Sequence, residues 1–245
     1  MTPEIIMLGG LILLFSSIMK GIAGFGTALF AMPLLTAFFF SPAEARPIIV
    51  SINLLLNFFI LVKEKNFTLK NFTDLSPLIL SGFVFAVATG FFLGYVDARI
   101  FNIIFGSLLV FTALNKVIGF NFSIKRYKPY FIPVGSLGGI LNTLIGAGGV
   151  PVLIFFSNTP LKKESFRLNI LLYFFAINVG AITSFLIFDD YPLQALGYTA
   201  IFTPFVILGS LIGMRALGRI NNAHFQRLVA VLLLVMGLDS LLNIL

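Results

Sequence analysis

The chain contains no cysteine, a single histidine and few charged residues. Without cysteine it cannot form a disulfide, a thiolate nucleophile or an iron–sulfur cluster. His224 alone cannot make a multi-histidine metal centre. The apolar stretches hold no serine–histidine or paired-aspartate motif. We therefore expect no enzyme, and no catalytic residue, metal or cofactor.

Charged residues make up only 10% of the 245 residues, whereas a soluble domain carries roughly 25%. Hydrophobic residues make up 59%, and the mean hydropathy is +1.07. They form long blocks, such as 168–188, 193–214 and 228–245, each about as long as a bilayer crossing. The N-terminus lacks the basic region and cleavage site of a signal peptide, so residues 5–19 are expected to be mature structure. The sequence predicts an all-α, polytopic membrane protein.

Two long apolar tracts, residues 5–40 and 130–158, are interrupted by glycine clusters. The clusters are Gly21, Gly24 and Gly26 in the first tract, and Gly146, Gly148 and Gly149 in the second. The pieces on either side of each cluster are short for full spans. Backbone that is not helical leaves N–H groups unpaired, which lipid tolerates only where a cavity or ligand satisfies them. The clusters therefore predict breaks that line a cavity.

The two halves of the chain repeat. A glycine break is followed in each half by an arginine and, eleven residues after it, an asparagine: Gly24, Arg46 and Asn57, then Gly146, Arg167 and Asn178. This order predicts two repeats, residues 1–120 and 121–245, in one integral membrane domain. Duplication around broken helices is typical of transporters.

The basic residues of the loops decide how the two tracts cross the membrane. If each tract were one broken spanning helix, seven loop cations would lie on one side and eight on the other, which is no bias. If each tract turns back at its glycines, thirteen lie on one side, leaving only Arg46 and Arg99 opposite. The positive-inside rule favours the second arrangement. Each half is then a glycine-broken helical hairpin followed by three transmembrane helices, with the repeats inverted and both termini extracytoplasmic. The +7 net charge then indicates cytoplasmic loops and no nucleic-acid partner.

The glycine turns are the predicted substrate site. A helix that begins after such a turn points free N–H groups and a positive dipole end at the cavity, and two such turns meeting near the mid-plane suit an anion. The candidate substrate-binding residues are Lys20, Gly24, Phe25, Gly26, Thr27, Asn53, Asn57, Asn142, Gly146, Gly148, Gly149 and Asn178. The alternative is that the glycines only allow close helix packing.

Lys20 is the only basic residue deep in an apolar tract, where a substrate anion would be a suitable partner. Snorkelling or pairing with a carbonyl is the alternative. Asn57 and Asn178 lie about 16 Å along a helix from Arg46 and Arg167, which puts both amides near mid-membrane. Hydrogen bonding between helices is the alternative for these amides. The two arginines lie at span ends, as interfacial anchors or an anion vestibule.

The segments GIAGFGTALFAMPLL (21–35) and LIGAGGVPVLIFF (144–156) resemble the TauE/SafE family of sulfite and sulfonate exporters. The resemblance implies a small, two-repeat protein of a prokaryotic (bacterial or archaeal) inner membrane. It also implies that sulfite, organosulfonates or related sulfur-containing organic anions pass along the glycine turns. The halves differ in one respect: Pro33 follows Gly26 by seven residues, whereas Pro151 follows Gly149 almost directly.

These observations predict a secondary transporter that exports such an anion by alternating access. An anion channel on the same scaffold, and uptake in place of export, are the alternatives. The expected partners are a small anionic substrate and the lipid bilayer. A homodimer is an open alternative to a monomer.

Overall fold

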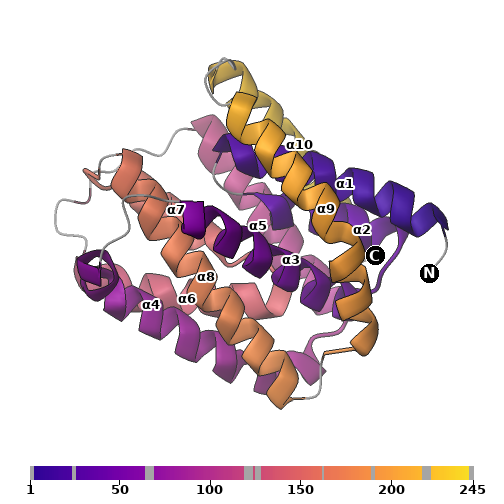
Figure 1. Cartoon of the computed structure of the whole chain (residues 1–245), viewed down its shortest axis with the longest axis horizontal. Helices are drawn as coiled ribbons and strands as arrows, with labels where there is room; N and C mark the ends of the chain where they lie inside the picture. Colours follow the sequence, from indigo (N-terminus) through magenta and orange to yellow (C-terminus); the bar gives the residue numbers. More distant parts are fainter. Residues whose placement is uncertain are drawn as a thin grey trace. The chain divides into compact units, whose positions relative to one another are not determined.

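The structure is a computed structural model of the chain (Figure 1). It describes residues 3–23, 26–63, 69–118, 124, 128–161, 163–188, 191–216 and 222–242. These ranges contain helices and no strand. The α-helices are α1 (Pro3–Ala23), α2 (Thr27–Phe38), α3 (Pro42–Lys63), α4 (Leu69–Thr89), α5 (Ala98–Ile118), α6 (Phe131–Ile145), α7 (Gly149–Ser157), α8 (Lys163–Ile187), α9 (Leu193–Ala216) and α10 (Asn222–Leu242). Two 3₁₀ helices, η1 (Gly90–Tyr95) and η2 (Lys128–Tyr130), join them.

Six of these helices are long and apolar enough to cross a membrane: α1, α3, α4 with η1, α5, α8 and α9. Large apolar side chains cover their outer faces, among them Phe91, Leu193 and Leu208. Water would not tolerate so much exposed apolar surface, whereas lipid does. The chain is a multi-pass, all-helical membrane protein, as predicted.

Each glycine-broken tract folds into a helical hairpin. In the first hairpin the rings of Phe15 on α1 and Phe30 on α2 lie 6.3 Å apart, and in the second Phe131 on α6 lies 6.2 Å from Phe155 on α7. At 1.5 Å per residue, the 21-residue α1 is about 31 Å long and the 15-residue α6 about 22 Å. The first arm of the first hairpin can therefore span the hydrocarbon core, whereas that of the second has the length of a re-entrant segment.

Side-chain caps fix two of the helix starts. Ser41 and Glu44 form a capping box before α3: the Ser41 N–H donates to Glu44 Oε2 over 2.9 Å, and the Glu44 N–H donates to Ser41 Oγ. At the start of α5 the N–H of Ile100 donates to Asp97 Oδ1 over 2.8 Å. Acidic residues at these positions also favour the positive end of the helix dipole.

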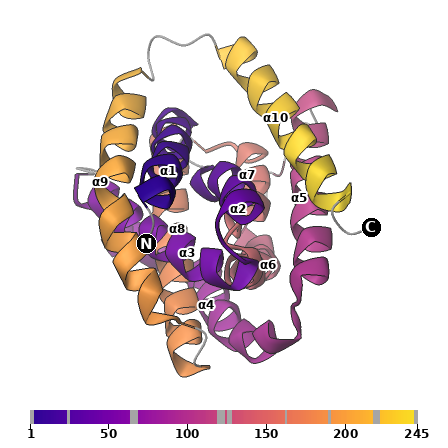
Figure 2. The ribbon, with the colours of Figure 1, turned by 90° about the vertical axis from the view of Figure 1, so that its right-hand side faces the viewer.

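The helices pack as two compact units. Unit 1 comprises Met1–Ala45, Tyr95–Asn121 and Ala200–Leu245, and unit 2 comprises Arg46–Gly94 and Phe122–Thr199. In unit 1 the hairpin α1–α2 packs with α9, and α5 lies beside α10 (Figure 2). In unit 2 the hairpin α6–α7 packs with α4 and α8 (Figure 1). Each unit thus combines the hairpin of one half of the sequence with helices of the other half.

Glycines bring helix backbones into contact in both units. A Cβ on Gly21 would lie 2.6 Å from the carbonyl oxygen of Ser210, which shows how closely α1 approaches α9. On α6, a Cβ on Gly139 would overlap the carbonyl oxygen of Gly82 on α4. Lipid supplies no hydrophobic force between helices, so close backbone packing of this kind holds membrane helices together.

Candidate substrate-binding site

The turn of the first hairpin depends on Gly26. This residue precedes α2 with φ 109°, a left-handed conformation that L side chains rarely adopt. A Cβ there would also lie 3.3 Å from the ring of Phe30. The predicted site residues Gly24 and Phe25 lie outside the described residues. Thr27, the first residue of α2, is 1% exposed.

Three buried polar side chains lie within the last two turns of α1 and the first residue of α2. They are Ser17, Lys20 and Thr27, and Lys20 is 3% exposed. The hydroxyls of Ser17 and Thr27 have no hydrogen-bond partner among the residues that the structure describes. An unsatisfied buried hydroxyl costs about 1–3 kcal/mol, which a bound water or ligand group would offset. Unit 1 therefore holds one buried cation and two open hydroxyls near its glycine turn.

Ser17 was not predicted from the sequence. It lies three residues before Lys20 and so shares its helix face. Its neighbour Ser16 instead donates to the carbonyl of Ile12 over 2.7 Å, as hydroxyls in membrane helices commonly do. Its position three residues before Lys20 is the sequence feature that could have identified Ser17 as a candidate site residue.

The turn of the second hairpin uses its three glycines in two ways. Gly146 has φ 72°, and its N–H donates to the carbonyl of Asn142 over 2.8 Å, which ends α6. Gly148 packs so closely on α6 that a Cβ would lie 2.5 Å from the Cβ of Asn142, and Gly149 faces the ring of Phe174. Close packing, the alternative explanation of the glycines, therefore applies to Gly148 and Gly149.

The amides of Asn142 and Asn178 are buried and bonded to each other in unit 2. Nδ2 of Asn142 donates to Oδ1 of Asn178 and to the carbonyl of Ile177, each over 3.2 Å. Nδ2 of Asn178 donates to the carbonyl of Phe174 over 2.7 Å. The structure thus brings two predicted site residues together, in the interhelical bonding that was the alternative to a ligand role.

The amide of Asn57, unlike those of Asn142 and Asn178, makes no hydrogen bond to a described residue. Its side chain is 0% exposed, and neither its Nδ2 nor its Oδ1 has a hydrogen-bond partner among the described residues. Asn53, one turn earlier on α3, is also buried. A fully buried amide with both ends open is costly, so Asn57 is the most unusual polar group of unit 2.

Arg46 lies beside the turn of the second hairpin. It is 2% exposed, and its Nη1 donates to the carbonyl of Leu144 over 3.5 Å. Ile49, one turn further along α3, lies against Gly146. The structure therefore buries Arg46 next to the glycine turn of unit 2. Arg167 lies in α8, but its side chain is outside the described residues.

The electrostatics of these residues favour an anion. Among the side chains whose burial the structure describes, Lys20 and Arg46 are the buried basic ones, and no aspartate or glutamate is buried. No group of three histidine, cysteine or acidic residues that could hold a metal occurs in the described part of the chain. Each unit therefore has one buried basic residue near a glycine turn. In unit 1, Lys20 lies near the hydroxyls of Ser17 and Thr27 in the sequence, and in unit 2 Arg46 lies on the same helix as the amide of Asn57. An excess of buried positive charge is stabilised by an anionic ligand.

Comparison with known proteins agrees with this chemistry. The profile of the protein family described as "Sulfite exporter TauE/SafE" matches residues 9–240. Neither a curated protein nor a solved structure gives a significant match.

Proposed function

Because the chain belongs to the sulfite exporter TauE/SafE family, we propose that it is a secondary transporter for sulfite, an organosulfonate or a related small sulfur-containing organic anion. The observation that carries the proposal is the burial of Lys20 and Arg46, each near a glycine turn, where no described carboxylate is buried. Export is the direction that an inside-negative potential favours, by about 2.3 kcal/mol per charge per 100 mV. Coupling to a second ion is therefore not required.

The residues have different roles along the proposed substrate path. Lys20 offsets the charge of the anion, and the backbone N–H groups at the turns, around residues 24–27 and 146–149, hold its oxygens. The open amide of Asn57 supplies a further donor. Asn142 and Asn178 act mainly by fixing α6 against α8, because their amide donors are already used.

Alternating access between the two inverted repeats, residues 1–120 and 121–245, is the mechanism we propose. It is supported by the reciprocal packing of the hairpins. The hairpin of the first half, α1–α2, packs on α9 of the second half, and the hairpin of the second half, α6–α7, packs on α4 of the first. Since α4 and α9 are the third elements of their repeats, the two contacts are equivalent. Inverted repeats that exchange elements in this way are a transporter architecture.

We place the protein in a prokaryotic inner membrane with both termini extracytoplasmic. The support is the thirteen-to-two division of loop cations that follows when both tracts are hairpins.

Flux through proteoliposomes tests the function. The purified chain is reconstituted, a potential is imposed, and uptake of sulfite and of methanesulfonate is followed, with sulfate and chloride as controls. We expect flux of the sulfur anions that saturates with concentration, as a carrier requires. Flux that rises without saturation would identify a channel, and no flux of either sulfur anion would contradict the substrate assignment.

A further inference from the structure

A small polar pocket lies in unit 2, away from the glycine turn. Its volume is about 220 Å³, and its polar lining comprises Asp74, Lys128, Ser165 and Asn169. Leu75 and Phe131, both buried, form its apolar wall. The first two turns of α4, the start of α6 and the first two turns of α8 meet here. We call it the access pocket.

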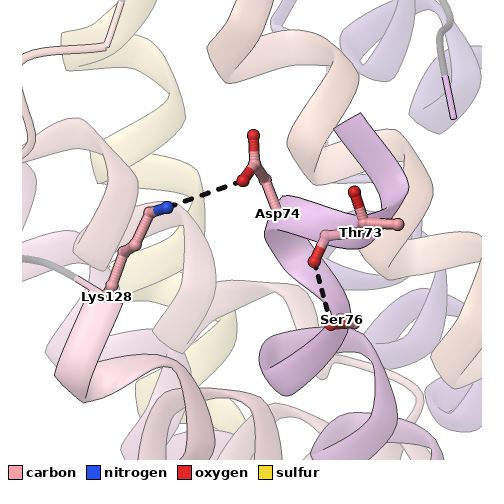
Figure 3. Close-up of polar contacts among 4 residues, drawn as sticks. All are labelled: Thr73, Asp74, Ser76 and Lys128. Carbon is pink, nitrogen blue, oxygen red and sulfur yellow. Dashed lines mark hydrogen bonds and ion pairs between the residues drawn. The ribbon is translucent and has the colours of Figure 1, made fainter. Parts of the chain in front are cut away.

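An ion pair lies at the edge of the access pocket. Lys128 Nζ and Asp74 Oδ1 are 3.6 Å apart, and the two side chains point toward each other from η2 and α4 (Figure 3). The side chain of Lys128 is 66% exposed and that of Asp74 54% exposed. An exposed pair of this kind contributes only about 0–1 kcal/mol, so either partner exchanges readily for another ion.

The other two polar side chains of the access pocket are available to bind a ligand. The side chains of Ser165 and Asn169, one turn apart on α8, have no hydrogen-bond partner among the described residues. With the ammonium of Lys128 they offer a hydroxyl donor, an amide donor and a cation to one small volume. Sulfonate and sulfite groups accept several hydrogen bonds and carry negative charge, so this set of donors matches them.

The access pocket and the buried amides lie along the same helix, α8. On α8 the face that begins with Ser165 and Asn169 passes through Tyr173 to Ile177, whose carbonyl accepts from Asn142. The Tyr173 hydroxyl donates to the carbonyl of Gly135 on α6 over 2.7 Å and lies between the two ends. Asn169 and Ile177 are about 12 Å apart along α8. The access pocket and the amide pair thus share the α6–α8 interface.

The charge of the sequence around this pocket also favours an anion. The segments that precede or begin α4, α6 and α8 in the sequence hold eight lysines and arginines, at positions 63–70, 125–128 and 162–163. A concentration of one sign of charge raises the local concentration of the opposite ion. Under the topology proposed above, these segments are cytoplasmic.

We propose that the access pocket is a first binding site for small sulfonate-like oxyanions, and that Asp74 holds Lys128 until an anion displaces it. The inference rests on the proposed transport function, for which it assigns the cytoplasmic docking site. Asp74 acts as a competitor of the anion for the same ammonium, and it excludes anions too weakly charged to displace it. Ser165 and Asn169 orient the oxygens of the bound group.

Asp74→Asn and Lys128→Gln test the pocket, with methanesulfonate as the probe. Two readouts are used: the half-saturating concentration for flux in proteoliposomes, and the concentration dependence of thermal stabilisation in detergent. We expect Asp74→Asn to lower both concentrations about twofold to fivefold, and Lys128→Gln to raise them about tenfold. The differences should disappear in 1 M salt, where exposed charges are screened.

Ser76→Ala is the matched control, because Ser76 lies on the same turn of α4 but donates to the carbonyl of Thr73 over 2.9 Å (Figure 3). It should behave as the wild type. The double variant Asp74→Lys with Lys128→Asp restores an ion pair with its charges exchanged. If that variant regains wild-type values and both single variants raise the half-saturating concentration, the pair is purely structural and the proposal is wrong.

The two proposals fail separately. Wild-type flux with an unchanged half-saturating concentration in Lys128→Gln would overturn the access pocket and leave the transporter intact. Thermal stabilisation that depends on Lys128, without flux in the wild type, would support the pocket and contradict transport.

Discussion

Asn142 donates from Nδ2 to Oδ1 of Asn178 over 3.2 Å and so ties the first arm of the second hairpin to α8. The side chain of Asn178 is fixed in turn, because its Nδ2 donates to the carbonyl of Phe174. By contrast Asn57, its counterpart in the first half of the sequence, has an amide without a partner among the described residues. Two asparagines at matching positions of the predicted repeat therefore differ: the amide of Asn178 is bonded within the protein, and that of Asn57 has no described partner.

The Asn142–Asn178 pair should couple in a double-mutant cycle. Asn142→Ala and Asn178→Ala each remove an interhelical bond, and we expect each to lower the free energy of unfolding by about 0.6–1.7 kcal/mol. The double variant should lose less than the two single losses together, because each single variant leaves a polar partner unpaired. Reversible unfolding in mixed detergent micelles measures the three values. Strict additivity would show that the amides do not interact.

Asn57→Leu should stabilise the protein while impairing transport. Leucine has a similar volume and removes an amide whose two polar atoms are unpaired, so the free energy of unfolding should rise by about 1–3 kcal/mol. If the amide serves the substrate, flux falls in the same variant. Melting temperature and flux are measured on the same preparation.

The matched control for Asn57→Leu is Asn142→Leu, which removes an amide of the same kind whose bonds are made. It should destabilise. A loss of stability in Asn57→Leu as large as in this control would show that the Asn57 amide is satisfied within the protein.

Gly26→Ala should strain the turn of the first hairpin. A side chain at φ 109° costs about 1–2 kcal/mol, and the added methyl would press on the Phe30 ring. We expect a lower free energy of unfolding and reduced flux. Gly94→Ala is the control, since nothing lies within 4 Å of a Cβ there. Equal behaviour of the two variants would mean that the turn does not require glycine.

The hairpins could be predicted from the sequence because two signals agreed. The glycine clusters marked the breaks, and the division of loop cations favoured tracts that return to the side from which they enter. The structure adds which glycines need a left-handed backbone, Gly26 and Gly146, and which pack against a neighbouring helix. A glycine needed for a left-handed backbone cannot be distinguished in the sequence from a glycine needed for close helix packing.

The partners of the helices could not be predicted. Nothing in the spacing of Gly139 indicates that it meets Gly82, because which small residues face each other depends on the whole packing. The start of α4 at Leu69 also lies outside any long apolar block of the sequence. The first turns of α4 are polar and carry Asp74, half of the access-pocket ion pair, so the same lack of hydrophobicity concealed that pocket.

The proposed topology predicts which single cysteines can be labelled from outside. The chain has no native cysteine, so Lys125→Cys and Asp190→Cys each introduce one unique site. In intact cells a membrane-impermeant thiol reagent should label the cysteine at position 190 and not the one at 125. Position 125 should become reactive once the membrane is opened with detergent. External labelling at 125 but not at 190 would contradict the hairpin arrangement.

Substitutions of Lys20 should affect transport and stability in opposite directions. Lys20→Ala should abolish anion flux although the protein still inserts, since the cation that offsets the substrate charge is gone. Lys20→Met keeps the length and packing of the side chain, and exchanging a buried charge for an apolar group is often neutral or stabilising. We therefore expect Lys20→Met to melt at or above the wild-type temperature while its flux falls at least about tenfold, which is the loss of one charge-assisted contact. Arg99→Ala, an exposed cation at the start of α5, is the control and should retain wild-type flux. Wild-type flux in Lys20→Met would show that the buried ammonium serves the fold and not the anion.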